Sequence, residues 1–279
     1  MRRRLCNLFL MILISAFFIT LWSMNLIQTG RLSRLNGAVV LSAEYREQTI
    51  DEKFFDFLKT RSKPGKYIGI YMLESKYGYE SFPYDFTTDI FEQLEKDWSK
   101  QKEWDDYIEI TKSIWDDVRY FPVPEFTRAQ ELTVSYVNTW MSERSYGGKR
   151  GHEGCDLMAS KNERGLYPII SMTDGVVKNK GWLEKGGYRI GIESPGGAYF
   201  YYAHLDSYSG LKEGDVVKAG DILGFMGDSG YGPEGTTGQF PVHLHLGIYI
   251  YPESVETSVN PYWVLRYLEK HKVKCYTEK

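Results

Sequence analysis

From residue 126 onward, the sequence consists of short runs of β-forming residues separated by glycine-containing turns. The expected strands are residues 169–172, 176–177, 188–193, 198–203, 216–217, 222–226 and 242–250. Turn signals such as Asp174-Gly175 and Gly186-Gly187 fall between them. Many short strands joined by tight turns predict an all-β domain, built as a sandwich or a barrel-like sheet.

The last expected strand carries His243 and His245 inside an apolar run. Because side chains alternate along a strand, both imidazoles point to the same face of the sheet. Neutral imidazole is the commonest metal-binding side chain, and a second imidazole beside it can transfer a proton. Two half-exposed histidines without a metal would explain an isolated pair equally well. The chain has only five histidines, however, and His152 and His204 also fall in the β-rich part, which favours a metal site.

Residues 151–156 open this β-rich part with a second candidate pair. His152 and Asp156 are four residues apart in an extended stretch, so both reach the same side while Cys155 faces the opposite one. With the later histidine pair, they supply two nitrogens and a carboxylate oxygen. Such a set leaves a position open for water, as catalytic zinc sites do. Cys155 could be proposed as a thiolate ligand or nucleophile, but its orientation predicts an inert packing residue.

Three motifs in this order carry a family resemblance: His152-x-x-x-Asp156, Tyr202-Ala203-His204-Leu205 and His243-Leu244-His245. They resemble the lysostaphin/LytM-type family of zinc peptidoglycan endopeptidases. Residues 174–177 and 211–224 are similar to the connecting strands of that family. The resemblance covers residues 126–265, about half of the chain.

The resemblance implies a fold, a cofactor and a reaction. The implied fold is a two-sheet β-groove of the duplicated-hybrid-motif type, related to biotinyl/lipoyl barrels. One zinc ion per chain would be held by His152, Asp156 and His245, and His204 and His243 would be catalytic residues beside the reacting water. Members of this family cut peptide bonds in cell-wall stem peptides or cross-bridges.

The segment before the histidine pair departs from the family pattern. Residues 227–242 form a longer, glycine-rich approach where the family has a compact one, so the peptide bond that is accepted stays open. One alternative is a non-catalytic extracytoplasmic β-scaffold that binds a partner protein or a cell-wall glycan, because residues 213–221 also resemble hairpins of biotinyl/lipoyl carriers. A cupin-like metal enzyme would need a glutamate soon after the pair, where residues 248–251 are Ile, Tyr, Ile and Tyr. The complete metal set favours the peptidase.

The N-terminus has an apolar run over residues 8–22 that continues to Ile27, directly after Arg2-Arg3-Arg4. This run is long enough to span a bilayer, which takes about 20 helical residues. The arginines predict a cytoplasmic N-terminus, with everything after residue 30 outside the cell membrane. A cleaved signal peptide is the alternative. Small residues resembling a cleavage site occur only at Ala38 and Ala43, far past the run, so we expect a single uncleaved anchor.

Residues 31–125 are expected to form a helical region. A helix is predicted over residues 51–59, and apolar residues at three- and four-residue spacing predict two more over 90–98 and 104–118. Glu74 weakly resembles the acid of lysozyme-like enzymes, but without a partner carboxylate it is interpreted as a solvated glutamate at a helix end. The net charge of −3 and the lack of a basic face argue against a nucleic-acid partner.

The sequence therefore predicts four segments. Residues 1–30 form a cytoplasmic tip and transmembrane anchor, and residues 31–125 an extracytoplasmic helical region. Residues 126–265 form the zinc metallopeptidase β domain, and residues 266–279 a charged C-terminal tail. The expected partners are a peptidoglycan peptide as substrate and the membrane, through the N-terminal helix.

Overall fold

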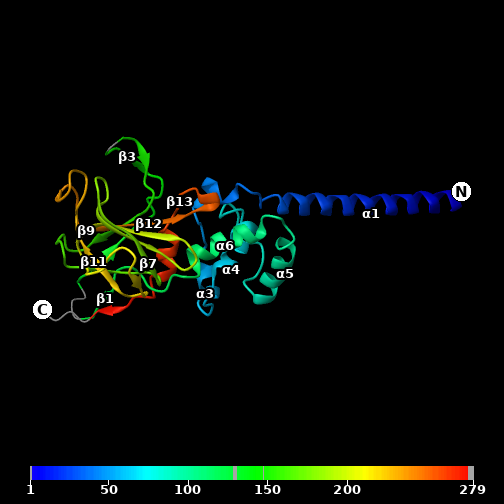
Figure 1. Cartoon of the computed structure of the whole chain (residues 1–279). Helices are drawn as coiled ribbons and strands as arrows, with labels where there is room; N and C mark the ends of the chain where they lie inside the picture. Colours follow the sequence, from blue (N-terminus) through cyan, green and yellow to red (C-terminus); the bar gives the residue numbers. More distant parts are fainter. Residues whose placement is uncertain (1, 128–130, 147, 276–279) are drawn as a thin grey trace.

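The computed structural model describes residues 2–127, 131–146 and 148–275. Met1 of the expected cytoplasmic tip and residues 276–279 of the expected tail lie outside this range. A long N-terminal helix, a helical region and a β-rich region follow one another along the chain (Figure 1).

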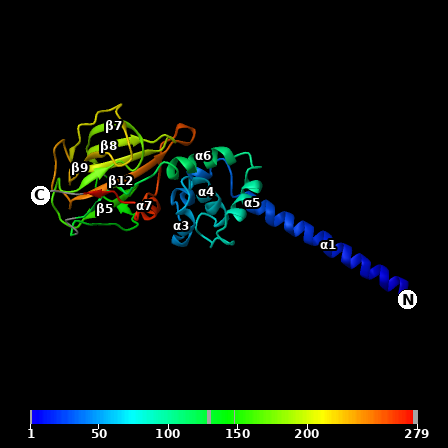
Figure 2. The same ribbon diagram turned by 90° about the horizontal axis from the view of Figure 1, so that it is seen from below.

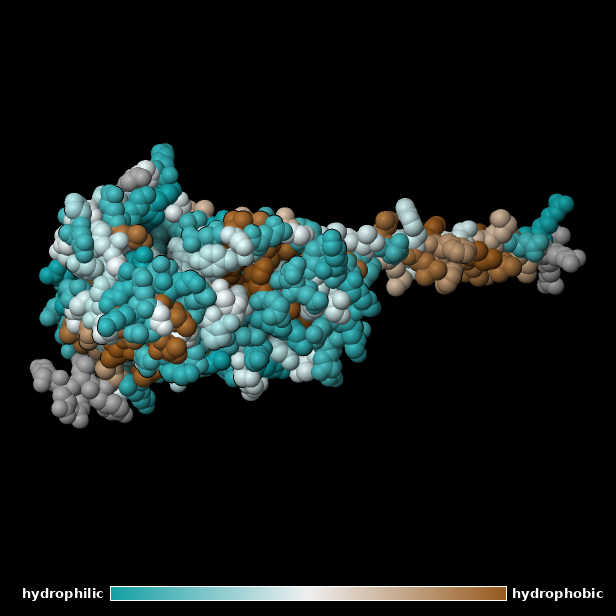
Figure 3. Space-filling view, in the orientation of Figure 1, coloured by the Kyte–Doolittle hydropathy of each residue, from teal (hydrophilic) through white to brown (hydrophobic). Residues whose placement is uncertain are grey.

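Helix α1 (Arg2–Leu32) projects from the rest of the molecule in both ribbon views (Figures 1 and 2). Its surface is hydrophobic along most of its length, whereas the body is mostly hydrophilic (Figure 3). Residues 4–32 are long and apolar enough to cross a membrane, a property that signal sequences share. In the last turn of α1, where the helix meets the body, Arg31 forms an ion pair with Glu74.

The helical region contains α2 (Ala43–Arg46), α3 (Glu52–Leu58), α4 (Gly65–Glu74), α5 (Thr88–Trp98) and α6 (Trp104–Trp115). Asp51 caps α3 and Thr87 caps α5, because each side chain accepts a backbone N–H of the first turn. Helix α4 is buried on nearly every side and contacts both α5 and α6. The predicted helices are present, although α6 ends three residues earlier than expected.

Glu74 is not the solvated residue that the sequence suggested. Its side chain is only 2% exposed and accepts hydrogen bonds from Arg31 Nε at 2.8 Å and Trp98 Nε1 at 2.8 Å. The interpretation was wrong because Arg31 and Trp98 are distant in sequence and meet Glu74 only in the folded chain. A buried carboxylate requires such partners.

The β-rich region is organised around one curled sheet. Its strand order is β10-β7-β8-β9-β12-β5-β2, with β13 on β12, and β11 pairing with both β6 and β9. The strands are β2 (Val134–Ser135), β5 (Cys155–Ala159), β6 (Pro168–Ile170), β7 (Gly175–Leu183), β8 (Gly187–Glu193), β9 (Tyr199–Tyr208), β10 (Val216–Val217), β11 (Ile222–Met226), β12 (His243–Ile250) and β13 (Thr257–Val259). Strands β7 and β9 extend beyond the predicted ends, because ladder hydrogen bonds continue past the apolar residues.

Three further elements complete this region. A small hairpin pairs β3 (Glu143–Arg144) with β4 (Arg150–Gly151), and β1 (Glu125–Phe126) pairs in parallel with β14 (Lys274–Cys275). Helix α7 (Tyr262–Leu268) was not predicted, so the region is mostly β and not all-β. The helical region packs on α7 and β13, where Arg46 donates to Ser258 O at 2.8 Å.

Candidate metal centre

The strand register brings four predicted site residues together. In the antiparallel ladders of β12, His245 lies opposite Asp156 of β5 and opposite Ala203 of β9. His243 is on the same face of β12 two residues earlier. His204 follows Ala203 where the register between β8 and β9 shifts, and its positive φ breaks the regular alternation that would turn it to the other face. His152 lies three residues before the start of β5. Cross-strand neighbours are about 5 Å apart, so side chains on one face can share a ligand.

Three ligand atoms converge on one point. His152 Nε2 is 3.1 Å from Asp156 Oδ1 and 3.1 Å from His245 Nδ1, and His245 Nδ1 is 2.9 Å from Asp156 Oδ1. Ligands at about 2.0–2.1 Å from a tetrahedral zinc ion are about 3.3 Å apart. The spacing and the donor types therefore fit one zinc ion.

Each candidate ligand is held by a neighbour. Thr139 Oγ1 lies 2.9 Å from His152 Nδ1, so this ring nitrogen can donate to the hydroxyl while Nε2 faces the other ligands. Arg144 donates to Asp156 Oδ2 at 2.7 Å, which leaves Oδ1 for a metal ion. The ring of His245 lies against Gly154, where no side chain would fit. The roles of Thr139 and Arg144 were not predicted, because the residues around them do not follow a spacing typical of metal ligands.

His204 and His243 lie beside this group with one ring nitrogen already used. His204 Nδ1 is 2.8 Å from Ser229 O, and His243 Nδ1 is 2.8 Å from Pro241 O. A carbonyl only accepts, so Nδ1 carries the proton in both rings and Nε2 keeps its lone pair. The two ring centroids are 4.7 Å apart, and His243 Nε2 is 3.8 Å from Asp156 Oδ1.

The backbone of His204 is strained. Its φ is 61°, in the left-handed region that β-strand residues rarely enter, and such a conformation costs on the order of 1–3 kcal/mol. It is held there by a hydrogen bond from its backbone N–H to Gly186 O at 2.8 Å and by the bond from its ring to Ser229. Strain maintained by this many contacts is typical of functional residues.

Burial sets the charge of these groups. It lowers the pKa of His152, His204 and His243, so the three imidazoles are neutral near pH 7, as metal ligands and general bases must be. Burial also opposes ionisation of Asp156, but its polar contacts with His152 and His245 and the charge of the neighbouring histidines outweigh burial and hold the pKa of the carboxyl well below its usual range. Asp156 is therefore an ionised carboxylate.

Cys155 lies on the side of the strand away from Asp156, as predicted. Cys155 is buried and its Sγ is directed at Val137 O, 3.7 Å away, while burial raises the pKa of the thiol to about 12. It is an inert packing residue, as predicted. His271, the fifth histidine, does not line the cleft and lies at a tilt against Tyr267, with ring centroids 5.7 Å apart. Residues 227–230 are fixed at the site, because Ser229 is fully buried and its carbonyl oxygen contacts the His204 ring.

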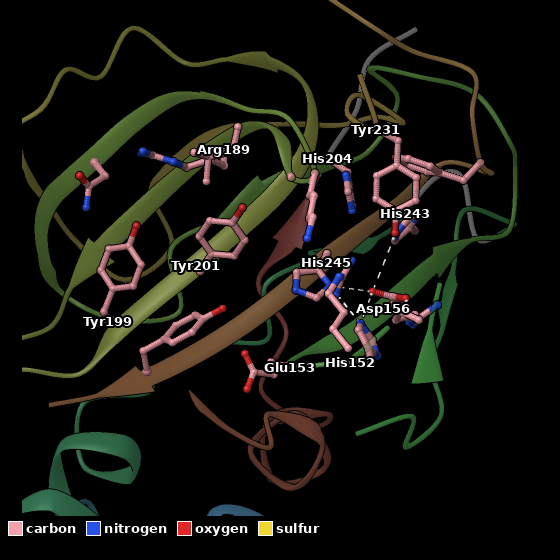
Figure 4. A pocket seen from close by; sticks show the side chains of 18 of the residues that line it. His152, Glu153, Asp156, Arg189, Tyr199, Tyr201, His204, Tyr231, His243 and His245 are labelled. Carbon is pink, nitrogen blue, oxygen red and sulfur yellow. Dashed lines mark hydrogen bonds and ion pairs between the residues drawn. The ribbon is translucent and has the colours of Figure 1, made fainter. Parts of the chain in front are cut away.

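The five site residues lie in a cleft of about 500 Å³. Figure 4 shows His152, Asp156 and His245 converging, with His204 and His243 beside them and Tyr201, Tyr199 and Arg189 further along. Tyr231, from the glycine-rich loop, lies at the other end and stacks on Tyr146 with ring centroids 4.1 Å apart. Two histidines and a carboxylate with two further imidazoles beside them in an open cleft are typical of metal-dependent hydrolases.

Comparisons with known proteins agree with this class. Residues 150–261 match the model of peptidase family M23, and residues 30–117 match that of the LytM N-terminal domain. A solved structure assigned to a glycyl-glycine endopeptidase, LytM, from Ruminococcus gnavus is 53% identical with a TM-score of 0.84, over 89% of this chain and 99% of that chain. The chain therefore belongs to peptidase family M23.

Two curated relatives share only part of their length with this chain. The L-Ala–D-Glu endopeptidase of Bacillus subtilis is 44% identical over 152 residues, which are 54% of this chain and 44% of that protein. Lysostaphin of Staphylococcus simulans is 30% identical over 139 residues, 47% of this chain and 26% of that protein. The chain thus matches less than half of either relative.

Proposed function

We propose that this protein is a zinc-dependent endopeptidase that hydrolyses peptide bonds in peptidoglycan stem peptides or cross-bridges. The observation that carries the proposal is the convergence of His152 Nε2, Asp156 Oδ1 and His245 Nδ1 to about 3 Å from one another. Membership of family M23 and the names of the two curated relatives support peptidoglycan as the substrate.

The residues of the site divide into two roles. When bound by His152, Asp156 and His245, zinc would polarise the scissile carbonyl and lower the pKa of water towards about 7. His204 Nε2 and His243 Nε2 accept the proton of the attacking water and return a proton to the leaving amine. Their Nδ1–H groups stay bonded to Ser229 O and Pro241 O, which keeps the correct tautomer throughout.

The arrangement in the cell is part of the same proposal. Helix α1 anchors the protein in the cell membrane, residues 31–125 form an extracytoplasmic helical region, and residues 126–265 form the catalytic domain facing the wall. The apolar surface of α1 supports the anchor. The same proposal includes a two-sheet groove of the duplicated-hybrid-motif type, whose two layers would be parts of the one sheet that β11 joins by pairing with β6 and β9. A mature native chain that begins near residues 38–44 would instead show a cleaved signal peptide.

Alanine substitutions of the five residues test the two roles. We expect His152→Ala, Asp156→Ala and His245→Ala to lose both zinc and wall cleavage. We expect His204→Ala and His243→Ala to retain about one zinc per chain while turnover falls by about a hundredfold or more.

Zinc content and cleavage are measured on the same preparations. If His243→Ala released zinc and His245→Ala retained it, the roles within the pair would be exchanged. If all five variants cleaved walls like the parent protein, the proposed function would be lost.

A further inference from the structure

The cleft extends from the metal group along a floor formed by β9 and β12. In the ladder between these strands, Gly247 lies opposite Tyr201 and Tyr249 lies opposite Tyr199. The ring centroids of Tyr201 and His245 are 6.1 Å apart, and those of Tyr201 and Tyr249 are 6.2 Å apart. The tyrosines therefore form an aromatic floor that begins at a candidate metal ligand.

Arg189 of β8 lies at this tyrosine-lined part of the cleft (Figure 4). Its Nη1 is buried and has no hydrogen-bond partner within residues 2–127, 131–146 and 148–275. A buried guanidinium nitrogen without a partner is costly, because it loses water and gains no acceptor. The nitrogen therefore has an unused donor, and the planar guanidinium is the group best suited to bind a carboxylate.

The acidic residues around the cleft are engaged elsewhere. Asp156 accepts from Arg144 and belongs to the metal group. Glu153 forms an ion pair with Arg46 at 3.2 Å, and Glu256 accepts from the hydroxyl of Tyr251 at 3.3 Å. An anion for Arg189 is therefore expected to arrive with the substrate.

The neighbouring tyrosines suit the same ligand. Burial raises the pKa of Tyr199 and Tyr201, so both hydroxyls stay protonated and can donate to an oxygen of a bound peptide. A neutral glycine cross-bridge would offer no side chain to the aromatic floor and no carboxylate to Arg189.

We propose that Arg189 binds a free carboxylate of the substrate, carried by an acidic residue next to the scissile bond. The preferred substrate is then an acidic stem peptide and not a glycine cross-bridge. This inference rests on the proposed endopeptidase function and selects between the two substrate classes that the function leaves open.

The test uses the zinc-loaded full chain and four synthetic peptides. One is a stem peptide with a free glutamyl carboxylate, the second has that carboxylate amidated, the third has only its C-terminal carboxylate amidated, and the fourth is pentaglycine. We expect the parent protein to favour the first over the second by roughly 10- to 100-fold in kcat/KM, the scale of a charged hydrogen bond. The third should be cut like the first, and pentaglycine slowly or not at all.

Substitution of the arginine should remove this preference. We expect Arg189→Gln to bring the acid-to-amide ratio close to one, mainly through KM for the acidic peptide, and Arg189→Lys to restore part of it. Arg119→Gln is the matched control, since it removes the same charge at an exposed position outside the cleft and should leave the ratio high. Thermal unfolding and zinc content of each variant verify its fold.

Several results would overturn the inference. The first is an unchanged acid-to-amide ratio in a folded Arg189→Gln variant, and the second is an equal loss of the ratio in Arg119→Gln. The third is sensitivity to the C-terminal amide in place of the glutamyl amide, and the fourth is pentaglycine cleavage as fast as that of the acidic peptide. Each of them leaves the endopeptidase function standing. Failure of the zinc-loaded parent protein to cut any of the peptides or purified walls would reject that function and this inference with it.

Discussion

Gly154 offers a test of whether the position of the His245 ring controls metal binding. A Cβ atom at residue 154 would lie 2.6 Å from His245 Nε2 and 2.7 Å from Leu246 O. Gly154 has no positive φ, so alanine can adopt its backbone conformation and the effect of Gly154→Ala is purely steric. The carbonyl of Leu246 is fixed in the ladder with Cys155, so the imidazole must give way.

The size of the effect follows from these distances. Van der Waals contacts of carbon atoms begin at about 3.5 Å, so the His245 ring has to move about 1 Å away from the added Cβ. Metal–ligand distances are set to within about 0.2 Å, so such a shift takes Nδ1 out of bonding range unless the ring tilts. We expect zinc affinity to fall by about 10- to 100-fold and the free energy of unfolding of the zinc-free protein to fall by about 1–3 kcal/mol.

Chelator competition measures the affinity, and thermal unfolding of the zinc-free protein measures the stability. Gly210→Ala is the matched control, because a Cβ there would meet nothing within 4 Å and its φ is not positive. It should leave both quantities unchanged. A Gly154→Ala variant with the zinc affinity and wall cleavage of the parent protein would refute the steric argument.

Two other perturbations test parts of the protein outside the metal group. Glu74→Gln should lower the free energy of unfolding by about 2 kcal/mol, because it removes the buried negative charge beside Arg31 and leaves the more exposed Asp97 as the anionic partner. Wall cleavage per folded molecule should stay unchanged, and equal urea midpoints for parent and variant would contradict this prediction. Shortening the loop within residues 232–238 should change the relative rates on several purified cell walls, because this part connects Tyr231 and Phe240, which both line the cleft, and loops beside rigid sites commonly set specificity. Unchanged relative rates would remove the loop from substrate selection.

The candidate site could be predicted from the sequence because its residues obey local periodicity. The alternation of side chains along one strand placed His243 and His245 on one face, and the same argument turned Cys155 away from Asp156. Both predictions depend only on the positions of residues that are close in the sequence. In the structure, His245 lies opposite Asp156 in the ladder between β12 and β5. The sequence predicted that both residues are in one site, but it did not predict this register.

Contacts between distant segments could not be predicted in the same way. Glu74 was interpreted as solvated because nothing within a few residues of it pairs with a carboxylate, whereas Arg31 lies 43 positions away in the chain. Thr139 and Arg189 lacked a signal for the same reason, since their roles depend on which segments meet at the cleft. Helix α7 was missed because its seven residues are too few to establish a helical period.

The glycine-rich loop shows where composition alone misleads. Glycine-rich segments are typically mobile, yet the first residues of this one belong to the site. Ser229 O accepts the proton of His204 Nδ1, while Ser229 Oγ donates to Leu205 O at 2.6 Å and accepts from Tyr188 N at 3.0 Å. Moving Ser229 would therefore release the His204 ring and disturb its tautomer. A loop that opens for substrate must bend after Gly230, so residues 231–238 can vary with the substrate while residues 227–230 have to stay fixed with the catalytic histidine.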